Sequence, residues 1–169
     1  MGMVVDLMAK MKVGTGIDRY IQKLVNLEFA SPHTAGKAVY EGAKIVADAI
    51  KAEIEALPVE KARKNSEDDK ATGITQRQKD GLRDGFGIAT MRQDGSFYNV
   101  KLGFHGYNSQ KTKKYPSGQP NAMIARAVEG GTSFRKKNPF VSRAVRKVRK
   151  QAEKKMAEVV DQEIKKIMM

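Results

Sequence analysis

The chain has 169 residues, of which 40% are hydrophobic, and this length and composition fit one folded domain with its own core rather than two. It contains no cysteine, so disulfide bonds and thiolate metal sites are both excluded. The formal net charge of +13 favours a negatively charged partner, whether phosphate, acidic lipid or an acidic protein surface, and does not choose among them.

Residues 1–15 are expected to form a flexible N-terminus. They are mildly apolar, but Asp6 and the early lysines interrupt them and no small-residue cleavage site follows, so we expect no signal peptide. No uninterrupted apolar run approaches the roughly 20 residues that a membrane-spanning helix needs. We therefore expect a soluble protein with no membrane partner.

Two helices are predicted in the first third of the chain. Apolar residues at helical spacing predict a short amphipathic helix over 16–28, which the sequence Ser-Pro-His-Thr at 31–34 interrupts. A longer, alanine-rich helix then runs from about 35 to 57, and Pro58 ends it. Its many small residues would let another backbone approach closely, although Gly42 lowers the stability of the helix by about 1 kcal/mol relative to alanine.

A charged segment follows these helices. It has almost no large apolar side chains and cannot offset the entropy of being ordered alone, so we expect a mobile loop near 59–74. A short helix is predicted over 75–82, because Thr75 is a good N-cap residue and glycines lie near the end of the segment.

The period next changes from helical to alternating, which indicates β-strands over 86–91 and 97–104. They flank Asp94-Gly95, and this dipeptide favours the positive backbone angles of a tight hairpin turn. The large side chains of the second strand fall on one face, and they are Tyr98, Val100, Leu102 and Phe104. We expect a helix to cover that face.

The C-terminal third begins with an aperiodic stretch rich in Gly, Asn, Ser and Lys, which predicts a second mobile loop near 105–120. Asn121 is expected to cap a short helix over 122–129, closed by two glycines. Pro139 then stands at the expected start of the longest helix, whose apolar stripe continues nearly to the C-terminus.

Together these elements predict a single α+β domain over 16–169. Two long helices and several short ones are expected to pack on a small antiparallel sheet that includes the β-hairpin.

Few residues are candidates for catalysis or metal binding. The only histidines are His33, expected at a helix start, and His105, expected in a loop, and we interpret both as structural or exposed. The acidic run Glu67-Asp68-Asp69 lies in the expected mobile loop and lacks the fixed geometry that a metal ion requires. We predict no catalytic residue, no metal site and no cofactor, so an enzyme is the weakest functional class.

Glycine-rich pieces at 85–87 and 130–132 do not match a nucleotide-binding motif. No Gly-Lys-Ser/Thr sequence is present, and Gly36-Lys37-Ala38 lies within a predicted helix.

Basic residues crowd the C-terminal part of the chain. The proposed docking residues are Arg135, Lys136, Lys137, Arg143, Arg146, Lys147 and Lys150. They are consistent with three interpretations: a salt-sensitive DNA contact, docking to an acidic protein neighbour, or a solvated helix face. Only Phe134 and Phe140 interleave the cluster, which argues against stacking on single strands.

The segments 125–134 and 138–144 resemble the tail-component, or tail-completion, family of long-tailed bacteriophages. The matching positions are Val128, Glu129, Gly131, Thr132, Pro139, Phe140, Val141 and Ala144. Gly130 stands where the family has an aromatic residue, and Ser142 and Arg143 stand where arginine and proline are commoner. The segment 115–125 is similar to a branch found in phages and prophages of Gram-positive bacteria.

This resemblance implies a structural virion protein of the phage neck, assembled in the cytoplasm of the host bacterium. It implies that the subunit joins the tail terminator or tail tube to the head-completion (stopper) proteins around the DNA path. It also implies a homo-oligomeric ring, with six subunits as the natural number. The alternative is a basic DNA-binding module that contacts packaged or exiting DNA.

Overall fold

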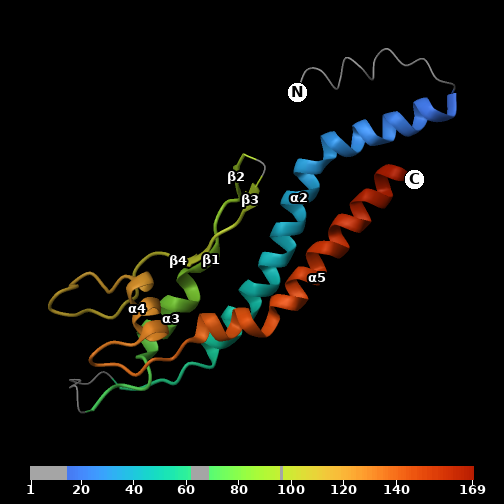
Figure 1. The fold of residues 1–169 in the computed structure, drawn as a ribbon. Coiled ribbons are helices and arrows are strands. Elements are labelled where there is room, and N and C mark those ends of the chain that lie inside the picture. Colours follow the sequence, from blue (N-terminus) through green and yellow to red (C-terminus); the bar gives the residue numbers. More distant parts are fainter. Residues whose placement is uncertain (1–14, 62–68, 96) are drawn as a thin grey trace.

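The computed structural model describes residues 15–61, 69–95 and 97–169 (Figure 1). The fold is mixed α+β and mostly helical, which confirms the predicted class. Apart from Thr15, the expected flexible N-terminus lies outside the described residues, and so does 62–68 of the first expected loop.

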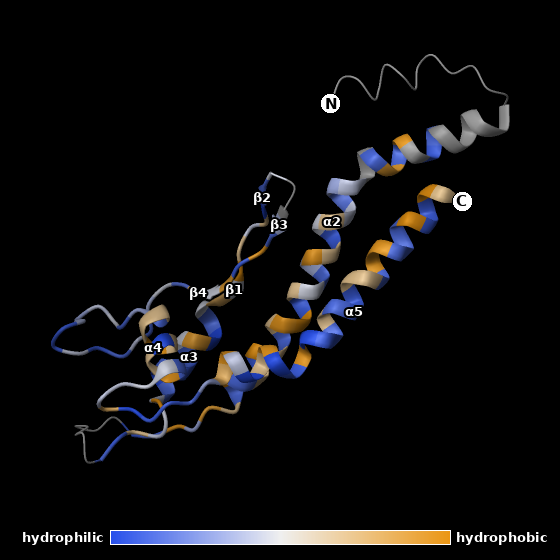
Figure 2. Cartoon of the chain, in the orientation of Figure 1, coloured by the Kyte–Doolittle hydropathy of each residue, from blue (hydrophilic) through white to orange (hydrophobic). Residues whose placement is uncertain are grey.

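Two long antiparallel helices, α2 (Thr15–Glu55) and α5 (Phe140–Met168), lie side by side along the molecule (Figure 1). Both are amphipathic, with hydrophobic and hydrophilic residues alternating along each ribbon (Figure 2). Small residues allow the two backbones to approach. A Cβ atom added at Gly42 would lie 3.5 Å from the backbone oxygen of Ala152 and 2.7 Å from Met156 Cγ, both in α5. The expected close approach at the alanine-rich helix is confirmed.

The predicted break between two N-terminal helices is wrong. Helix α2 continues through the segment 31–34, with Pro32 inside it and His33 exposed within the helix rather than at its start. Proline removes one helical hydrogen bond and favours a kink, and Figure 1 shows α2 bending in its N-terminal third. The neighbouring α5 runs along this part of α2, where Lys37 meets Glu163, and packing stabilises a helix that local propensity disfavours.

The predicted β-hairpin is present as two short ladders. Its strands are β1 (Phe86–Ile88), β2 (Arg92–Asp94), β3 (Phe97–Asn99) and β4 (Leu102–Phe104). Strand β1 pairs with β4, and β2 pairs with β3, both antiparallel. Gly95 has the expected positive φ of +60° in the turn, but Asp94 does not: it is the last residue of β2 and pairs with Phe97. Between the two ladders, the three residues 89–91 lie opposite only two residues, 100–101. The first side of the hairpin therefore has one residue more than the second, which makes a β-bulge.

The core lies where the hairpin base, the short helices and the start of α5 meet. Phe104 packs on Phe86, with ring centroids 5.1 Å apart, and on Phe140, at 6.1 Å. Phe140 is completely buried. Leu102 and Phe104 are half-buried against this core, so helices do cover the base of the second strand as expected.

The two short helices, α3 (Gln76–Gly85) and α4 (Asn121–Gly130), lie beside each other at this end of the molecule. Thr75 caps α3 as predicted, in a capping box with Gln78. Asn121 does not cap α4. It is the first helical residue, and its buried side chain donates instead to the His105 carbonyl oxygen at 2.9 Å, because the preceding loop passes directly over it.

Both expected loops lack regular secondary structure in their described parts, apart from isolated bridges, but their ends are held. Ile74 is buried, and its backbone N–H donates to the Pro58 carbonyl at 2.9 Å. In the second loop the Asn108 N–H donates to the Gln119 carbonyl at 2.9 Å. The mobility of the segments between these anchors stays a prediction.

Close packing of α3 predicts opposite outcomes for two helical glycines. A Cβ at Gly81 would lie 2.3 Å from Asn108 Cβ and 3.0 Å from its Cα, whereas a Cβ at Gly130 would meet nothing within 4 Å. Alanine favours a helix over glycine by about 1 kcal/mol at either position. We expect Gly81→Ala to lower the free energy of unfolding by about 1–3 kcal/mol and Gly130→Ala to leave it equal or higher, measured by urea denaturation.

Glu163 links the two long helices and makes stability depend on pH. Hydrogen bonds from Lys166, at 2.8 Å, and Lys37, at 2.7 Å, lower the pKa of Glu163 from 4.5 to about 2. Because the folded pKa is depressed, the stabilisation is present above pH 4.5 and is lost as the pH falls toward about 2. Thermal unfolding should therefore show a smaller loss of Tm between about pH 6 and pH 3 for Glu163→Gln than for the wild type. The exposed control Glu158→Gln should keep the wild-type profile.

Candidate functional site

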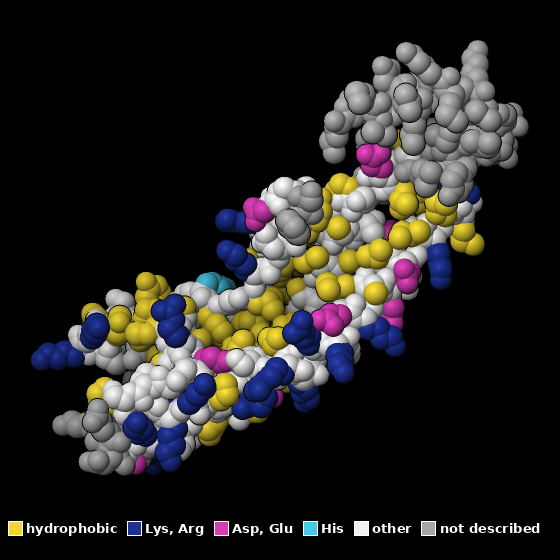
Figure 3. Space-filling model, in the orientation of Figure 1, with side chains coloured by type: hydrophobic (Ala, Val, Ile, Leu, Met, Phe, Trp, Pro, Cys, Tyr) yellow, Lys and Arg dark blue, Asp and Glu magenta, His cyan; other side chains and the backbone are white. Residues whose placement is uncertain are grey.

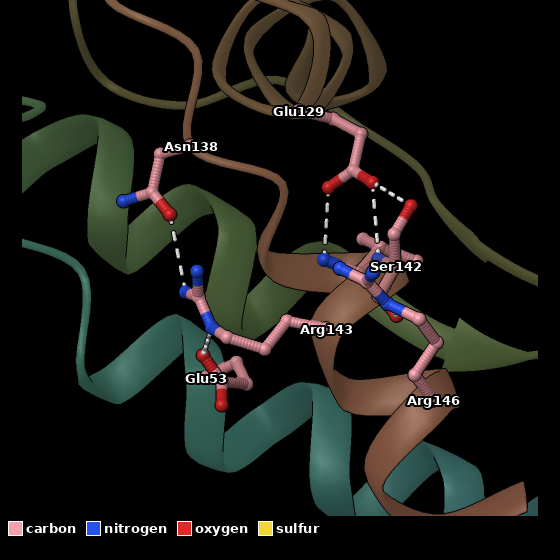
Figure 4. Close-up of polar contacts among 7 residues, drawn as sticks. Glu53, Glu129, Asn138, Ser142, Arg143 and Arg146 are labelled. Atoms are coloured by element: carbon pink, nitrogen blue, oxygen red, sulfur yellow. Dashed lines mark hydrogen bonds and ion pairs between the residues drawn. The ribbon is translucent and has the colours of Figure 1, made fainter.

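The start of α5 is held by a carboxylate from the end of α4. Glu129 Oε2 accepts the Val141 N–H at 2.9 Å, and Oε1 accepts the Ser142 N–H at 3.0 Å and the Ser142 hydroxyl (Figure 4). These amides belong to the first turn, which has no helical acceptors and lies at the positive end of the helix dipole. Glu129 therefore acts as an N-cap supplied from another helix.

A second set of contacts joins α5 to α2. Arg143 Nε donates to Glu53 Oε2 at 2.7 Å, and Arg143 Nη2 donates to Asn138 Oδ1 at 3.1 Å (Figure 4). The Asn138 N–H in turn donates to the Val128 carbonyl at 2.9 Å. Arg143 is thus used inside the subunit rather than held free for a partner.

The turn between α4 and α5 requires a glycine at 131. Gly131 has a φ of +76°, and a Cβ there would lie 3.1 Å from the Lys137 backbone nitrogen. The Thr132 hydroxyl accepts the Phe134 N–H at 3.2 Å, and Thr132 and Arg135 exchange backbone hydrogen bonds. This compact turn returns the chain to Pro139 at the N-cap of α5.

The residues that carry the family resemblance therefore build one joint. Val128, Phe140 and Ala144 are buried, Val141 packs against the core, and the others form the turn and the cap. Of the eight residues, only Thr132 is exposed. Their role is to fix where α5 begins and which side it exposes.

That exposed side is basic. Arg143, Arg146, Lys147, Lys150 and Lys154 recur at intervals of three or four residues, so they follow one stripe of the helix. The buried side chains of α5, including Ala144, Ala152 and Val159, lie on the opposite side. Lys and Arg side chains are spaced along the long helix in the space-filling view (Figure 3). We call Arg146, Lys147, Lys150 and Lys154 the basic stripe.

The stripe is incompletely neutralised. Lys154 lies 3.9 Å from Glu158, a weak contact, and Arg146 donates to the Ser142 carbonyl at 3.3 Å. Among the described residues, no acidic side chain pairs with Lys147 or Lys150. The stripe therefore offers charge that the subunit does not use itself.

The structure divides the predicted docking residues into two groups. Lys136, Lys137, Arg146, Lys147 and Lys150 are exposed. Arg135 instead turns inward and donates to the Gly73 carbonyl, while Arg143 pairs with Glu53. Sequence reasoning missed Lys154 as part of the stripe, although its spacing was visible, and missed Glu53, which lies 90 residues from its partner and carries no sequence signal.

Other predicted features lie apart from this site. His33 is exposed on α2, and His105 is exposed beside the hairpin base. Over 15–61, 69–95 and 97–169, no three His, Cys, Asp or Glu residues gather in a way that could hold a metal ion. In the same residues, no helix is long and apolar enough to cross a membrane.

Comparison of the chain with known protein families, with curated proteins and with solved structures finds no significant match.

Loss of the Glu129 cap should destabilise the start of α5 selectively. We expect Glu129→Ala to lower the free energy of unfolding by about 1–2 kcal/mol, because two backbone amides and a hydroxyl lose their acceptor. Hydrogen exchange at the Val141 and Ser142 amides should accelerate most. The matched change Glu158→Ala, at an exposed position of α5, should alter the free energy of unfolding by less than about 0.5 kcal/mol.

Proposed function

We propose that the chain is a structural protein of the bacteriophage virion, a tail-completion subunit at the neck. In this function it joins the tail terminator or tail tube to the head-completion proteins around the DNA path. Two facts support the proposal: the resemblance over 128–144, and the use of those residues to set the position of α5. The proposal assigns no enzymatic activity and no cofactor to the chain.

The observation that carries the proposal is the basic stripe on a fixed helix. Helix α5 is attached along its opposite side to α2 and at its start to Glu129, so the stripe needs little ordering on binding. Complementary charge speeds association and sets register, which suits a subunit that must dock in one orientation. An acidic surface on a neighbouring neck or tail protein is the partner that this stripe fits.

Ring formation follows from the same function. A closed ring forms when one surface of a subunit meets a different surface of the next through a rotation that closes. The resemblance implies six subunits, in register with the tail. Localisation in the virion neck belongs to the same proposal.

The stripe also favours a second candidate function, contact with DNA. It spans about 12 Å along the helix, from Arg146 to Lys154 at about 1.5 Å per residue. Four cations over this length could neutralise about four phosphates. In this function the helix would line the path of packaged or exiting DNA without reading its sequence.

Imaging of phage particles that contain the chain tests the first proposal. We expect density for the chain at the head–tail junction, and its absence there would reject the neck assignment. The triple variant Arg146→Gln, Lys147→Gln, Lys150→Gln should leave heads and tails unjoined. The variant Lys111→Gln, Lys113→Gln, Lys114→Gln removes the same charge from the second loop and should yield joined particles.

A salt titration separates DNA contact from protein docking. If the stripe contacts duplex DNA, the slope of log K against log salt should be about −3 to −4, and the stripe variant should reduce its magnitude by about 3. The loop variant, with equal net charge, should keep the wild-type slope. Affinity that is negligible at about 50 mM salt would exclude the DNA function.

A further inference from the structure

A cavity of about 310 Å³ lies at the loop-rich end of the molecule, away from the basic stripe. Its walls come from the ends of the first loop, the second loop, α3, α4 and the turn that leads to α5. Nothing in the proposed function uses this cavity.

Arg135 supplies a half-buried cation to the cavity. One guanidinium nitrogen, Nη1, donates to the Gly73 carbonyl, and in the described part of the chain the guanidinium forms no ion pair. Burial lowers the pKa of Arg135 and outweighs the charge of Glu60, which acts in the opposite direction. A guanidinium carries five donors, and a partly desolvated one is stabilised most by a carboxylate.

Neutral donors surround the same space. The hydroxyls of Thr112 and Thr132 accept backbone N–H groups from Tyr115 and Phe134, which leaves their own O–H groups to donate. The Gln119 side-chain oxygen accepts from Gln78 at 2.7 Å, so its amide nitrogen stays available.

The lining also includes Lys61 and one carboxylate, that of Glu60, whose Oε1 accepts the Thr72 N–H at 3.0 Å and the Thr72 hydroxyl. Two cationic side chains against one anionic side chain leave the lining net positive, and the neutral donors add to what a site for an anion requires.

The remaining wall is apolar. Ile74 and Ile124 are almost completely buried beneath the cavity, and Ala127 lines it. Phe134 is 51% exposed and also lines the cavity. A ligand that matches both parts has a negative group on a short aliphatic stem, and an extended backbone that can lie against an aromatic ring.

We propose that this cavity binds a glutamate side chain from an acidic peptide segment of a partner protein. The carboxylate pairs with Arg135 and accepts the hydroxyls of Thr112 and Thr132, while the methylene groups contact Ile124 and Ala127. A phosphate of duplex DNA fits less well, because it is attached to a stiff rod that cannot enter a concave site beside a half-buried guanidinium. The inference is independent of the neck assignment.

The test uses the full-length chain labelled with ¹⁵N and titrated with the peptide acetyl-Gly-Glu-Gly-amide. We expect saturable shifts of the Arg135 Nε–H and of the Thr112 and Thr132 amides. The neutral peptide acetyl-Gly-Gln-Gly-amide should bind at least about tenfold more weakly, because it cannot form the ion pair. Shifts confined to other regions, equal binding of both peptides, or tighter binding of inorganic phosphate would each overturn the proposal.

Matched variants assign the charge. Arg135→Gln should weaken binding of the glutamate peptide at least about tenfold, whereas Lys137→Gln, which removes equal charge from the exposed neighbour, should change it less than about twofold. If both variants lost the same affinity for the glutamate peptide, the binding would depend on net charge alone, and the proposed site would be rejected.

A second variant covers the case in which Arg135→Gln unfolds the turn. Thr112→Val with Thr132→Val keeps the guanidinium and should weaken binding about threefold to tenfold through the lost hydroxyl donors. Unchanged affinity in this double variant would contradict the proposed pose. The peptide titration needs only the isolated chain. Absence of peptide binding would therefore not contradict the neck proposal, and rejection of the neck proposal would not contradict observed peptide binding.

Discussion

The contact between α2 and α5 is the constraint on which the rest of the structure depends. Small residues set the distance between the two helices. Gly42 of α2 lies against Met156 of α5, and Ala144 and Ala152 of α5 are buried. Neither long helix has another helical partner of similar length among the described residues, so each is stabilised mainly by the other. The hairpin base and the short helices then pack where this pair meets Phe140. A larger side chain in the interface between α2 and α5 would move α5 and the exposed residues that it carries.

The segment that carries the family resemblance acts through architecture. Gly131 allows the chain to turn, Glu129 fixes the first turn of α5, and Phe140 anchors that turn in the core. A matching pattern in another chain would therefore imply the same placement of a helix rather than the same outward contacts. The outward residues, such as Lys147 and Lys150, lie beyond the motif and are free to suit a different neighbour.

Local signals predicted the features that depend on local chemistry. The Thr75 cap, the hairpin turn at Gly95 and the apolar stripe of the last helix each follow from residues within a few positions of one another. Features set by distant contacts were not predictable. Pro32 lies inside a helix because α5 packs along it, and the Arg143–Glu53 pair and the inward turn of Arg135 depend on segments joined only by folding. The basic character of α5 was visible in the sequence, but which cations stay exposed was not.

The β-bulge brings the hairpin into contact with α2. The bulged segment contains Met91, and a Cβ atom at Gly36 would lie only 2.6 Å from its terminal methyl carbon. The hairpin therefore touches α2 four residues after Pro32, just past the bend. The hairpin packs against α2 at its bulge as well as through β1 and β3. A larger residue at position 36 would meet the end of the Met91 side chain, which must turn away to make room for it.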